Sequence, residues 1–212
     1  MNNGDVSKQT TGRQDAYRAR TRASLLKSAH QVLADIGLSA TIEDLAKAAE
    51  VSPATIYNHF ESKDEYLKEA LNDIWLEWVL WAYDGRSQGE GIETKIDVCR
   101  KLFRVNKTHT LLGRILSKTL NDSSFVLDAI RPNAAKSFAA AVRKDGLEPK
   151  DLDIRLELWA QAVTGIFQAV FVTKKFSPET ADKALRISLA IWGIDGEQAE
   201  ALTSRPLKAP SN

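Results

Sequence analysis

The chain has 212 residues, enough for one large domain or two small ones around a sizeable core. Its 29 basic and 28 acidic residues nearly balance, which argues against indiscriminate binding of polyanions. It has no run of about 18 apolar residues, no apolar signal core and only one cysteine, Cys99, so we expect a soluble cytoplasmic protein with no membrane partner and no intrachain disulfide.

The first residues of the chain are basic and polar. Residues 1–34 hold six lysines and arginines against two aspartates, and residues 1–20 are almost free of large apolar side chains. This composition predicts a flexible basic arm over residues 1–20. The arm either wraps a phosphate backbone or minor groove, or is a solvated tail without a role.

Residues 21–67 show the pattern of a small helical unit. An apolar stripe over residues 25–33 predicts a first helix, which Gly37 ends as a left-handed cap. Three helix-start signals follow, namely Thr41 with Asp44, Ser52 with Pro53, and Ser62 with Glu65. Each signal places a hydroxyl where it can accept a hydrogen bond from the unpaired N–H groups of a first helical turn.

The helices that start after Thr41 and Ser52 share one apolar face. Their apolar positions are Ile42, Leu45, Ala46 and Ala49 on the first helix, then Ile56 and Phe60 on the second. The link over residues 49–51 is so short that the two helices must cross steeply. This spacing predicts a helix-turn-helix whose second helix faces outward.

The outward face of the second helix suits the major groove of DNA, which is about 12 Å wide. Its side chains are small or polar, so Asn58 can pair with adenine and the Thr55 methyl can touch a thymine methyl. Other polar groups and the helix starts supply donors for phosphate. The predicted DNA-binding residues are Thr41, Ser52, Pro53, Ala54, Thr55, Tyr57, Asn58, His59 and Lys63.

Residues 51–63, VSPATIYNHFESK, together with Leu25, Leu26, Ala29, Val32, Leu33 and Gly37, resemble the TetR family of bacterial transcriptional regulators. The resemblance covers residues 21–67, and the rest of the chain matches only in length and helical content. It implies a DNA-binding domain over residues 21–67, an effector-binding and dimerisation domain over 68–200, and a tail over 201–212. Glu50 stands where the family usually has glycine, so a positive φ there costs about 1 kcal/mol.

The remainder of the chain predicts helices separated by turn signals. We expect them over residues 62–83, 92–106, 108–120, 124–144 with a break or restart at Pro132, 152–175 and 178–194. The expected fold is all-α, with a three-helix head that contains the helix-turn-helix and a larger helical body for ligand binding and dimerisation.

Three tryptophans recur at steps of three residues along the helix that starts after Ser62. They form part of the core, or they line an apolar cavity for a small organic effector. His109 and Gln161 are candidates to orient such a ligand, although His109 also suits a surface or capping role. The candidate ligand-binding residues are Trp75, Trp78, Trp81, Phe103, His109, Leu112, Leu116, Phe125 and Gln161.

The last two predicted helices are apolar nearly all round. Helices of this kind would leave an exposed apolar patch unless a second subunit covered it. We therefore expect a twofold homodimer through a four-helix bundle, as the family resemblance also implies. The candidate dimerisation residues are Trp159, Val163, Phe167, Val170, Leu185, Leu189 and Trp192.

These features predict an effector-responsive DNA-binding regulator, a repressor that binds a pseudo-palindromic operator as a homodimer and is released by a small, largely apolar molecule. The three histidines lie far apart, and the chain has no glycine-rich phosphate loop or G-x-S-x-G turn, so we expect no enzyme activity, no cofactor and no metal. The alternative is a helical interaction or small-molecule-binding protein without effective DNA binding, which Glu50 and the near-neutral charge favour.

Overall fold

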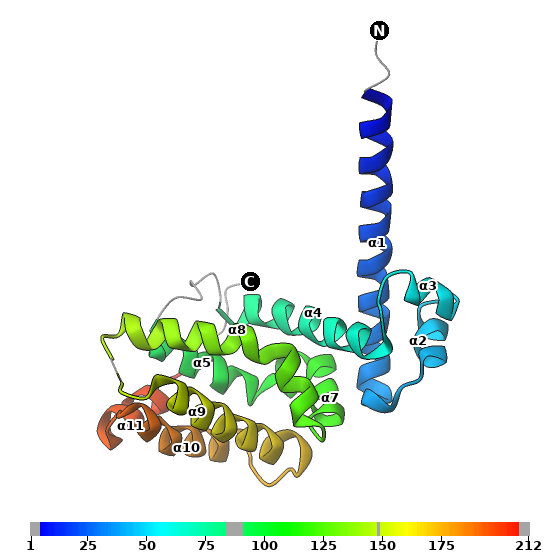
Figure 1. Cartoon of the computed structure of the whole chain (residues 1–212). Coiled ribbons are helices and arrows are strands. Elements are labelled where there is room, and N and C mark those ends of the chain that lie inside the picture. The colour runs from blue at the N-terminus through cyan, green and yellow to red at the C-terminus, as the bar shows by residue number, and fades with distance from the viewer. Residues whose placement is uncertain (1–4, 84–90, 148, 208–212) are drawn as a thin grey trace.

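The computed structural model describes residues 5–83, 91–147 and 149–207, and gives the backbone alone for residues 5–12, 123 and 127–135. Within these ranges every regular element is helical, which confirms the all-α prediction. Figure 1 shows a small head at one end of the molecule and a larger helical body beside it. None of the described helices is long and apolar enough to cross a membrane.

The head consists of α1 (Asp5–Asp35), the 3₁₀ turn η1 (Gly37–Ser39), α2 (Ile42–Ala48) and α3 (Pro53–Tyr57). Their apolar faces meet in one core, where the side chains of Leu25, Leu33, Leu45, Ile56 and Phe60 are at most 2% exposed. Gly37 has a φ of 84°, which confirms the predicted left-handed end of the first helix. The head therefore forms as the apolar stripes predict.

The N-terminal arm differs from the flexible segment that the composition predicts. The helix α1 begins at Asp5 and runs without a break into the head, so residues 5–20 are helical, while residues 1–4 lie outside the described part. Apart from Gly12, this stretch is rich in good helix formers such as alanine, arginine and glutamine. Because the head already nucleates α1, extending the helix toward the N-terminus needs no second nucleation step.

The helix α4 (Lys63–Tyr83) joins the head to the body. Its start is confirmed as predicted, since the backbone N–H of Glu65 donates to the Ser62 hydroxyl at 3.1 Å. The Glu65 carboxylate accepts from the backbone N–H of Glu61. Tyr66 ties the two parts together through a buried hydrogen bond from its hydroxyl to the Leu25 carbonyl, at 2.6 Å.

The body comprises α5 (Ile92–Leu102), α6 (Val105–Thr108), α7 (Thr110–Thr119), α8 (Ser123–Lys144), α9 (Leu152–Phe167), η2 (Gln168–Val172), α10 (Pro178–Ser188), η3 (Leu189–Trp192) and α11 (Gly196–Ser204). Two boundaries differ from prediction: α8 continues across position 132, and the helix expected over 92–106 ends at Leu102. The predicted turn over residues 84–90 lies outside the described residues.

Two elements of the body differ from the sequence prediction: η2 lies within the helix expected over residues 152–175 but is of another helical type, and α11 was not predicted. The segment η2 is a π-helix that continues α9, and such segments often mark functional positions. The helix α11 starts at Asp195, whose carboxylate accepts from the backbone N–H of Gln198 at 2.8 Å. It extends into the range expected to be a C-terminal tail.

The helix α7 is the part of the body that packs most closely on the head. A Cβ added to Gly37 would lie 3.3 Å from the Lys118 carbonyl oxygen, so the start of η1 presses on the backbone of α7. Arg114 of α7 forms an ion pair with Asp35 at the end of α1. The opposite face of α7 is in the core of the body, because Leu112 and Leu116 are buried there.

Candidate DNA-binding and effector sites

The starts of α2 and α3 are fixed by hydroxyl caps. The Thr41 hydroxyl accepts from the Asp44 N–H at 3.1 Å, and the Asp44 carboxylate accepts from the Thr41 N–H at 2.9 Å, which completes a capping box. The Ser52 hydroxyl accepts from the Thr55 N–H at 3.2 Å, with Pro53 in the first turn. These local bonds confirm two of the predicted helix starts.

The helix α3 presents its polar face outward. Ile56 and Phe60 are buried in the head, whereas Ala54 and Asn58 are exposed and Tyr57 is 51% exposed. Ser52 is exposed, and Pro53 and Thr55 are half-buried. The exposed residues Ala54, Tyr57 and Asn58, at i, i+3 and i+4, therefore share one accessible side of this short helix and its C-terminal cap.

Two predicted phosphate anchors are engaged inside the head. The Lys63 ammonium donates to the carbonyl of Ala40 at 3.0 Å and to that of Leu38 at 3.5 Å. The Thr41 hydroxyl also donates to the Asp44 carboxylate at 2.7 Å. Thr41 therefore stabilises the start of α2, and Lys63 stabilises the chain between η1 and α2. Residue type and spacing did not predict this role for Lys63.

His59 is half-buried just after α3, and its Nδ1 atom is enclosed without a hydrogen-bond partner among the described residues. Burial lowers the pKa of His59, and the nearby charges of Arg18 and Arg22 lower it further. The imidazole is therefore neutral near pH 7 and is not a cationic anchor. Arg18 itself donates to the Asn58 carbonyl at 3.2 Å, which joins α1 to the end of α3.

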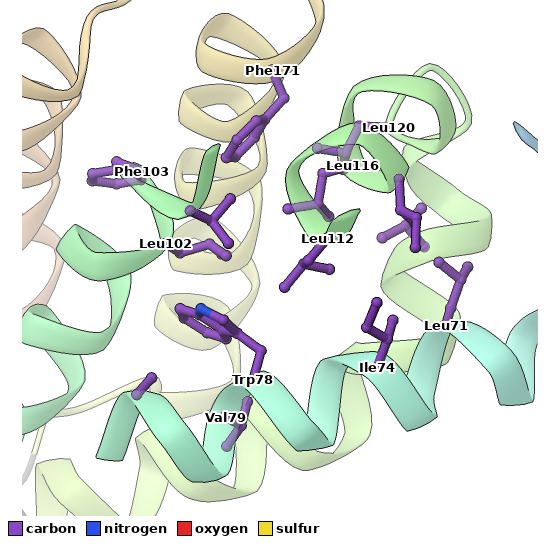
Figure 2. Packing of buried hydrophobic residues seen from close by; sticks show 14 of the residues in the cluster. Leu71, Ile74, Trp78, Val79, Leu102, Phe103, Leu112, Leu116, Leu120 and Phe171 are labelled. Carbon is purple, nitrogen blue, oxygen red and sulfur yellow. The ribbon is translucent and has the colours of Figure 1, made fainter. Parts of the chain in front are cut away.

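A second candidate site lies in the core of the body. Figure 2 shows Trp78 of α4, Leu112 and Leu116 of α7, and Phe171 of η2 pointing toward one another. Each of these side chains is at most 3% exposed, and Phe103 beside them is 1% exposed. The indole Nε1 of Trp78 is buried and has no hydrogen-bond partner among the described residues. A donor left unpaired in an apolar interior costs about 1–3 kcal/mol.

The other predicted ligand-binding residues lie at the edge of this cluster or outside it. Trp75 packs on Trp78 with ring centroids 5.2 Å apart, and Trp81 meets the His109 ring edge-on at 4.4 Å. Phe125 lies under the Lys68 ammonium, 5.2 Å from its centroid.

Two polar candidates have different environments. Gln161 is exposed on α9 and donates to Glu157 at 3.0 Å, so the structure does not place it with the cluster. Burial lowers the pKa of His109, although Glu77 opposes the shift, and the buried His109 Nδ1 has no hydrogen-bond partner among the described residues.

The residues expected at the dimer interface are mostly buried within the chain itself. Trp159 and Trp192 pack on Phe138 with ring centroids 4.8 and 4.9 Å away. Val163 and Phe167 are half-buried. The predicted interface residues that are at most 6% exposed, and so present little surface to a partner, are Trp159, Val170, Leu185, Leu189 and Trp192.

Other apolar side chains of α9 and α10 do face solvent. Ile154 and Leu158 of α9 are 59% and 53% exposed, and Ile187 of α10 is 76% exposed. Helical periodicity could not separate these from the core residues, because both helices are apolar on several faces. The predicted dimerisation residues therefore face mainly the core of the chain, and the exposed apolar side chains lie on another side of the same helices.

A cavity that the sequence did not predict, of about 690 Å³, opens where the start of α5, the end of α8 and α11 meet. In this region the Asp145 carboxylate accepts a hydrogen bond from the Ile92 N–H at 2.7 Å. It therefore already pairs with a backbone donor at the start of α5. Gly91 leaves room for this contact, because a Cβ there would lie 2.2 Å from Asp145 Oδ1.

Residues 25–70, which cover most of the head and the first turns of α4, match the family model described as bacterial regulatory proteins, tetR family. The head of the chain therefore has the sequence of a TetR-family DNA-binding domain. The TetR-family head is also 38% identical over 66 residues to the HTH-type transcriptional repressor KstR2 of Mycolicibacterium smegmatis. That match spans 31% of this chain and 32% of the relative, so the chain matches about a third of the relative's length.

Solved structures match the chain over most of its length. RolR in complex with resorcinol is 19% identical, with a TM-score of 0.67, and the match covers 92% of this chain and 99% of RolR. A TetR-family regulator from Rhodococcus sp. is 18% identical, with a TM-score of 0.60 and coverage of 87% and 99%. Thermus thermophilus FadR in complex with lauroyl-CoA is 19% identical, with a TM-score of 0.54 and coverage of 79% and 93%. At these identities the likeness concerns the fold.

Proposed function

We propose that this TetR-family chain is an effector-responsive repressor that binds a pseudo-palindromic operator as a homodimer and is released by a small, largely apolar molecule. The observation that carries the proposal is the outward face of α3, where Asn58 and Tyr57 are exposed on a helix held from behind by Ile56 and Phe60. The repressor KstR2, which the head resembles, supports the same assignment.

In this proposal the α3 side chains divide between base reading and positioning. The exposed Asn58 amide can donate to and accept from one adenine edge in the major groove. The Tyr57 hydroxyl can donate to a phosphate, which fixes the register of the head without reading sequence. Two heads related by a twofold axis would read half-sites about 34–36 Å apart, or a multiple of that spacing.

The apolar surface of Ile154, Leu158 and Ile187 supports a homodimer. Three large apolar side chains on two adjacent helices, each more than half exposed, are costly in water and pack well against a second copy. A Cβ added to Gly165 on α9 would meet no atom within 4 Å, so a partner helix can approach closely there. Two copies of α9 and α10 would form a four-helix bundle.

The cluster around Trp78 supports an effector of particular chemistry. The surrounding side chains are apolar, so a ligand there would be largely apolar, and the unpaired Nε1–H requires one acceptor oxygen or nitrogen on it. Resorcinol in RolR and lauroyl-CoA in FadR each combine an apolar part with oxygen atoms. We propose a ligand of this general class.

The position of α7 provides a route from the cluster to the head. A ligand that displaces Leu112 or Leu116 moves α7, which contacts α1 through Arg114 and η1 through Lys118 on its other side. A ligand that binds the form with displaced α7 better than the DNA-binding form shifts the population toward the displaced form. The two heads of the dimer then no longer have the spacing of the half-sites. A coupling of about 1–3 kcal/mol would change operator affinity by about 5 to 150 fold.

DNA binding is tested by fluorescence anisotropy on DNA selected from a random palindromic library and on the region upstream of the coding sequence. The parent protein should bind a pseudo-palindrome, and Asn58→Ala should weaken binding by about 1–3 kcal/mol at one base position of each half-site. Lys150→Gln, an exposed change in the body, is the control. Failure to select any palindrome would favour the alternative, a helical ligand-binding or interaction protein without effective DNA binding.

The effector site is tested with Trp78→Phe, which keeps an aromatic ring and removes the unpaired donor. Phenols and acyl compounds that release the parent from DNA should act on this variant only at about tenfold higher concentration, as expected when one hydrogen bond is removed. Trp75→Phe, at the edge of the cluster, serves as the matched control. Equal ligand responses of Trp78→Phe and the parent would place the effector elsewhere.

A further inference from the structure

The N-terminal part of α1 projects from the head as a single exposed helix. We call residues 5–20 the forearm; every described side chain in it, from Arg13 to Arg20, is exposed. Figure 1 shows this part of α1 extending past α3 and away from the body. A helix of this length without packing partners is only marginally stable in water, so a binding partner would stabilise it.

The composition of the forearm limits what that partner can be. Tyr17, which is 74% exposed, is the one large apolar or aromatic residue among residues 13–20, so no apolar stripe is available for a protein core or a membrane. The same range holds three arginines and one acidic residue, Asp15. A positively charged helix without an apolar face suits a polyanion.

The placement of the forearm selects DNA as that polyanion. Arg18 donates to the Asn58 carbonyl at the end of α3, so the forearm is fixed beside the helix that is proposed to enter the major groove. Arg13, Tyr17 and Arg20 are spaced i, i+4 and i+7, which places them on one face of the helix over about 10 Å. That face carries two cationic groups with a hydroxyl donor between them.

We propose that the forearm is a second DNA-contacting element, a rigid helix whose Arg13, Tyr17 and Arg20 bind backbone phosphates next to the half-site read by α3. The inference rests on the proposed operator binding and adds a sequence-independent contact to it. Phosphate contacts of this kind set affinity and its salt dependence and leave base preference unchanged.

The experiment measures operator affinity by fluorescence anisotropy between about 50 and 200 mM salt. The variant Arg13→Gln with Arg20→Gln removes two charges and keeps good helix formers. Its slope of log affinity against log salt should be shallower by about 0.9 for each phosphate that the variant no longer neutralises. The control, Lys144→Gln with Lys150→Gln, removes two exposed charges of the body, at the end of α8 and shortly after it, and should keep the parental slope.

A second variant tests whether the helical form matters. Ala16→Pro retains every charge and interrupts the forearm, while the head core starts only at Leu25. Weaker operator binding by Ala16→Pro is expected, and circular dichroism should show a decrease in helix content. Parental affinity of Ala16→Pro would show that a flexible tail suffices and would overturn the proposal.

The outcomes separate this inference from the proposed function. Suppose that the parent binds its operator and that Asn58→Ala weakens this binding. If the double arginine variant then leaves the salt slope unchanged, the forearm contact alone is overturned. A parent that binds no DNA overturns both proposals. A changed base preference in the arginine variant would also contradict a contact limited to phosphates.

Discussion

Glu50 occupies the residue position in the head where the backbone is most constrained. Its φ is 55°, in the left-handed region that glycine adopts easily. The Val51 N–H donates to the Ala46 carbonyl at 3.0 Å and the Glu50 N–H to the Lys47 carbonyl at 3.2 Å. These two bonds form a Schellman motif that ends α2 and sets the direction in which α3 leaves.

Replacing Glu50 with glycine should therefore stabilise the protein. The left-handed conformation costs a side-chain-bearing residue about 1 kcal/mol, so Glu50→Gly should raise the free energy of unfolding by up to about that amount in a urea titration. Ala48→Gly, two residues earlier at the end of α2, should instead lower it by up to about 1 kcal/mol. A loss of stability in Glu50→Gly would show that the Glu50 side chain makes a compensating interaction.

His30 makes stability depend on pH. It is 5% exposed between α1 and α4, and burial lowers its pKa from the usual 6.5, although Asp73 at 3.3 Å opposes the shift. As the pH falls below about 6.5 the unfolded chain binds a proton that the folded protein resists, so the free energy of unfolding decreases.

The pH dependence can be measured by urea titrations between about pH 5.5 and 7.5. His30→Gln, which does not titrate, should show a smaller loss of stability at the acid end than the parent. An identical pH profile in both proteins would assign the dependence to the other histidines, His59 and His109, whose pKa values burial also lowers.

The residues that sequence predicted correctly depend on near neighbours. Thr41, Ser52 and Ser62 cap their helices through bonds that reach three residues along the chain, so type and spacing suffice. The role of Lys63 depends on carbonyls more than 20 residues earlier in the sequence, at Leu38 and Ala40. Such contacts exist only once the tertiary structure has formed.

At the scale of elements, α2 is a short helix that relies on its first turn. Thr41→Ala removes the hydroxyl of the capping box and should lower the free energy of unfolding by about 1 kcal/mol. Thr41→Ser keeps the hydroxyl and should remain within about 0.5 kcal/mol of the parent. Thermal or urea denaturation checks both, and equal losses in the two variants would assign the effect to the Thr41 methyl group.

The limits of element prediction have a common physical cause. The body helices were located because their apolar periodicity is local, but the apolar repeat of α9 and α10 could not tell core-facing from exposed sides. Trp159 and Trp192 are accordingly in the core, while Leu158 is exposed. The forearm was expected to be flexible because composition does not show that the head would nucleate a helix extending into it.

At the scale of the whole molecule, the exposed face of α9 and α10 should determine the oligomeric state. Leu158→Glu places a charge in the centre of the proposed dimer surface and should shift the protein from dimer to monomer in light scattering after size exclusion. Lys144→Glu, which introduces the same side chain at the far end of α8, should remain dimeric. A dimeric Leu158→Glu variant would place the interface on another surface.

The TetR-family head was predictable from sequence because it rests on a short, specific motif, and the all-α body was predictable because apolar periodicity is local. The arrangement of the candidate effector site could not be predicted, since the grouping of Trp78 with Phe171 joins residues that lie far apart in the sequence of the body. Within the candidate set, Trp78, Phe103, Leu112 and Leu116 belong to that buried group, whereas Gln161 does not.

The uninterrupted course of α1 has a mechanical consequence. Its 31 residues span about 46 Å, from the Asp35 contact with α7 to the tip of the forearm. A rotation of about 5° at the end near Asp35 would carry the tip about 4 Å sideways, more than the length of a hydrogen bond. A small displacement of α7 is thereby amplified with distance, and contacts near the tip would break before those of α3.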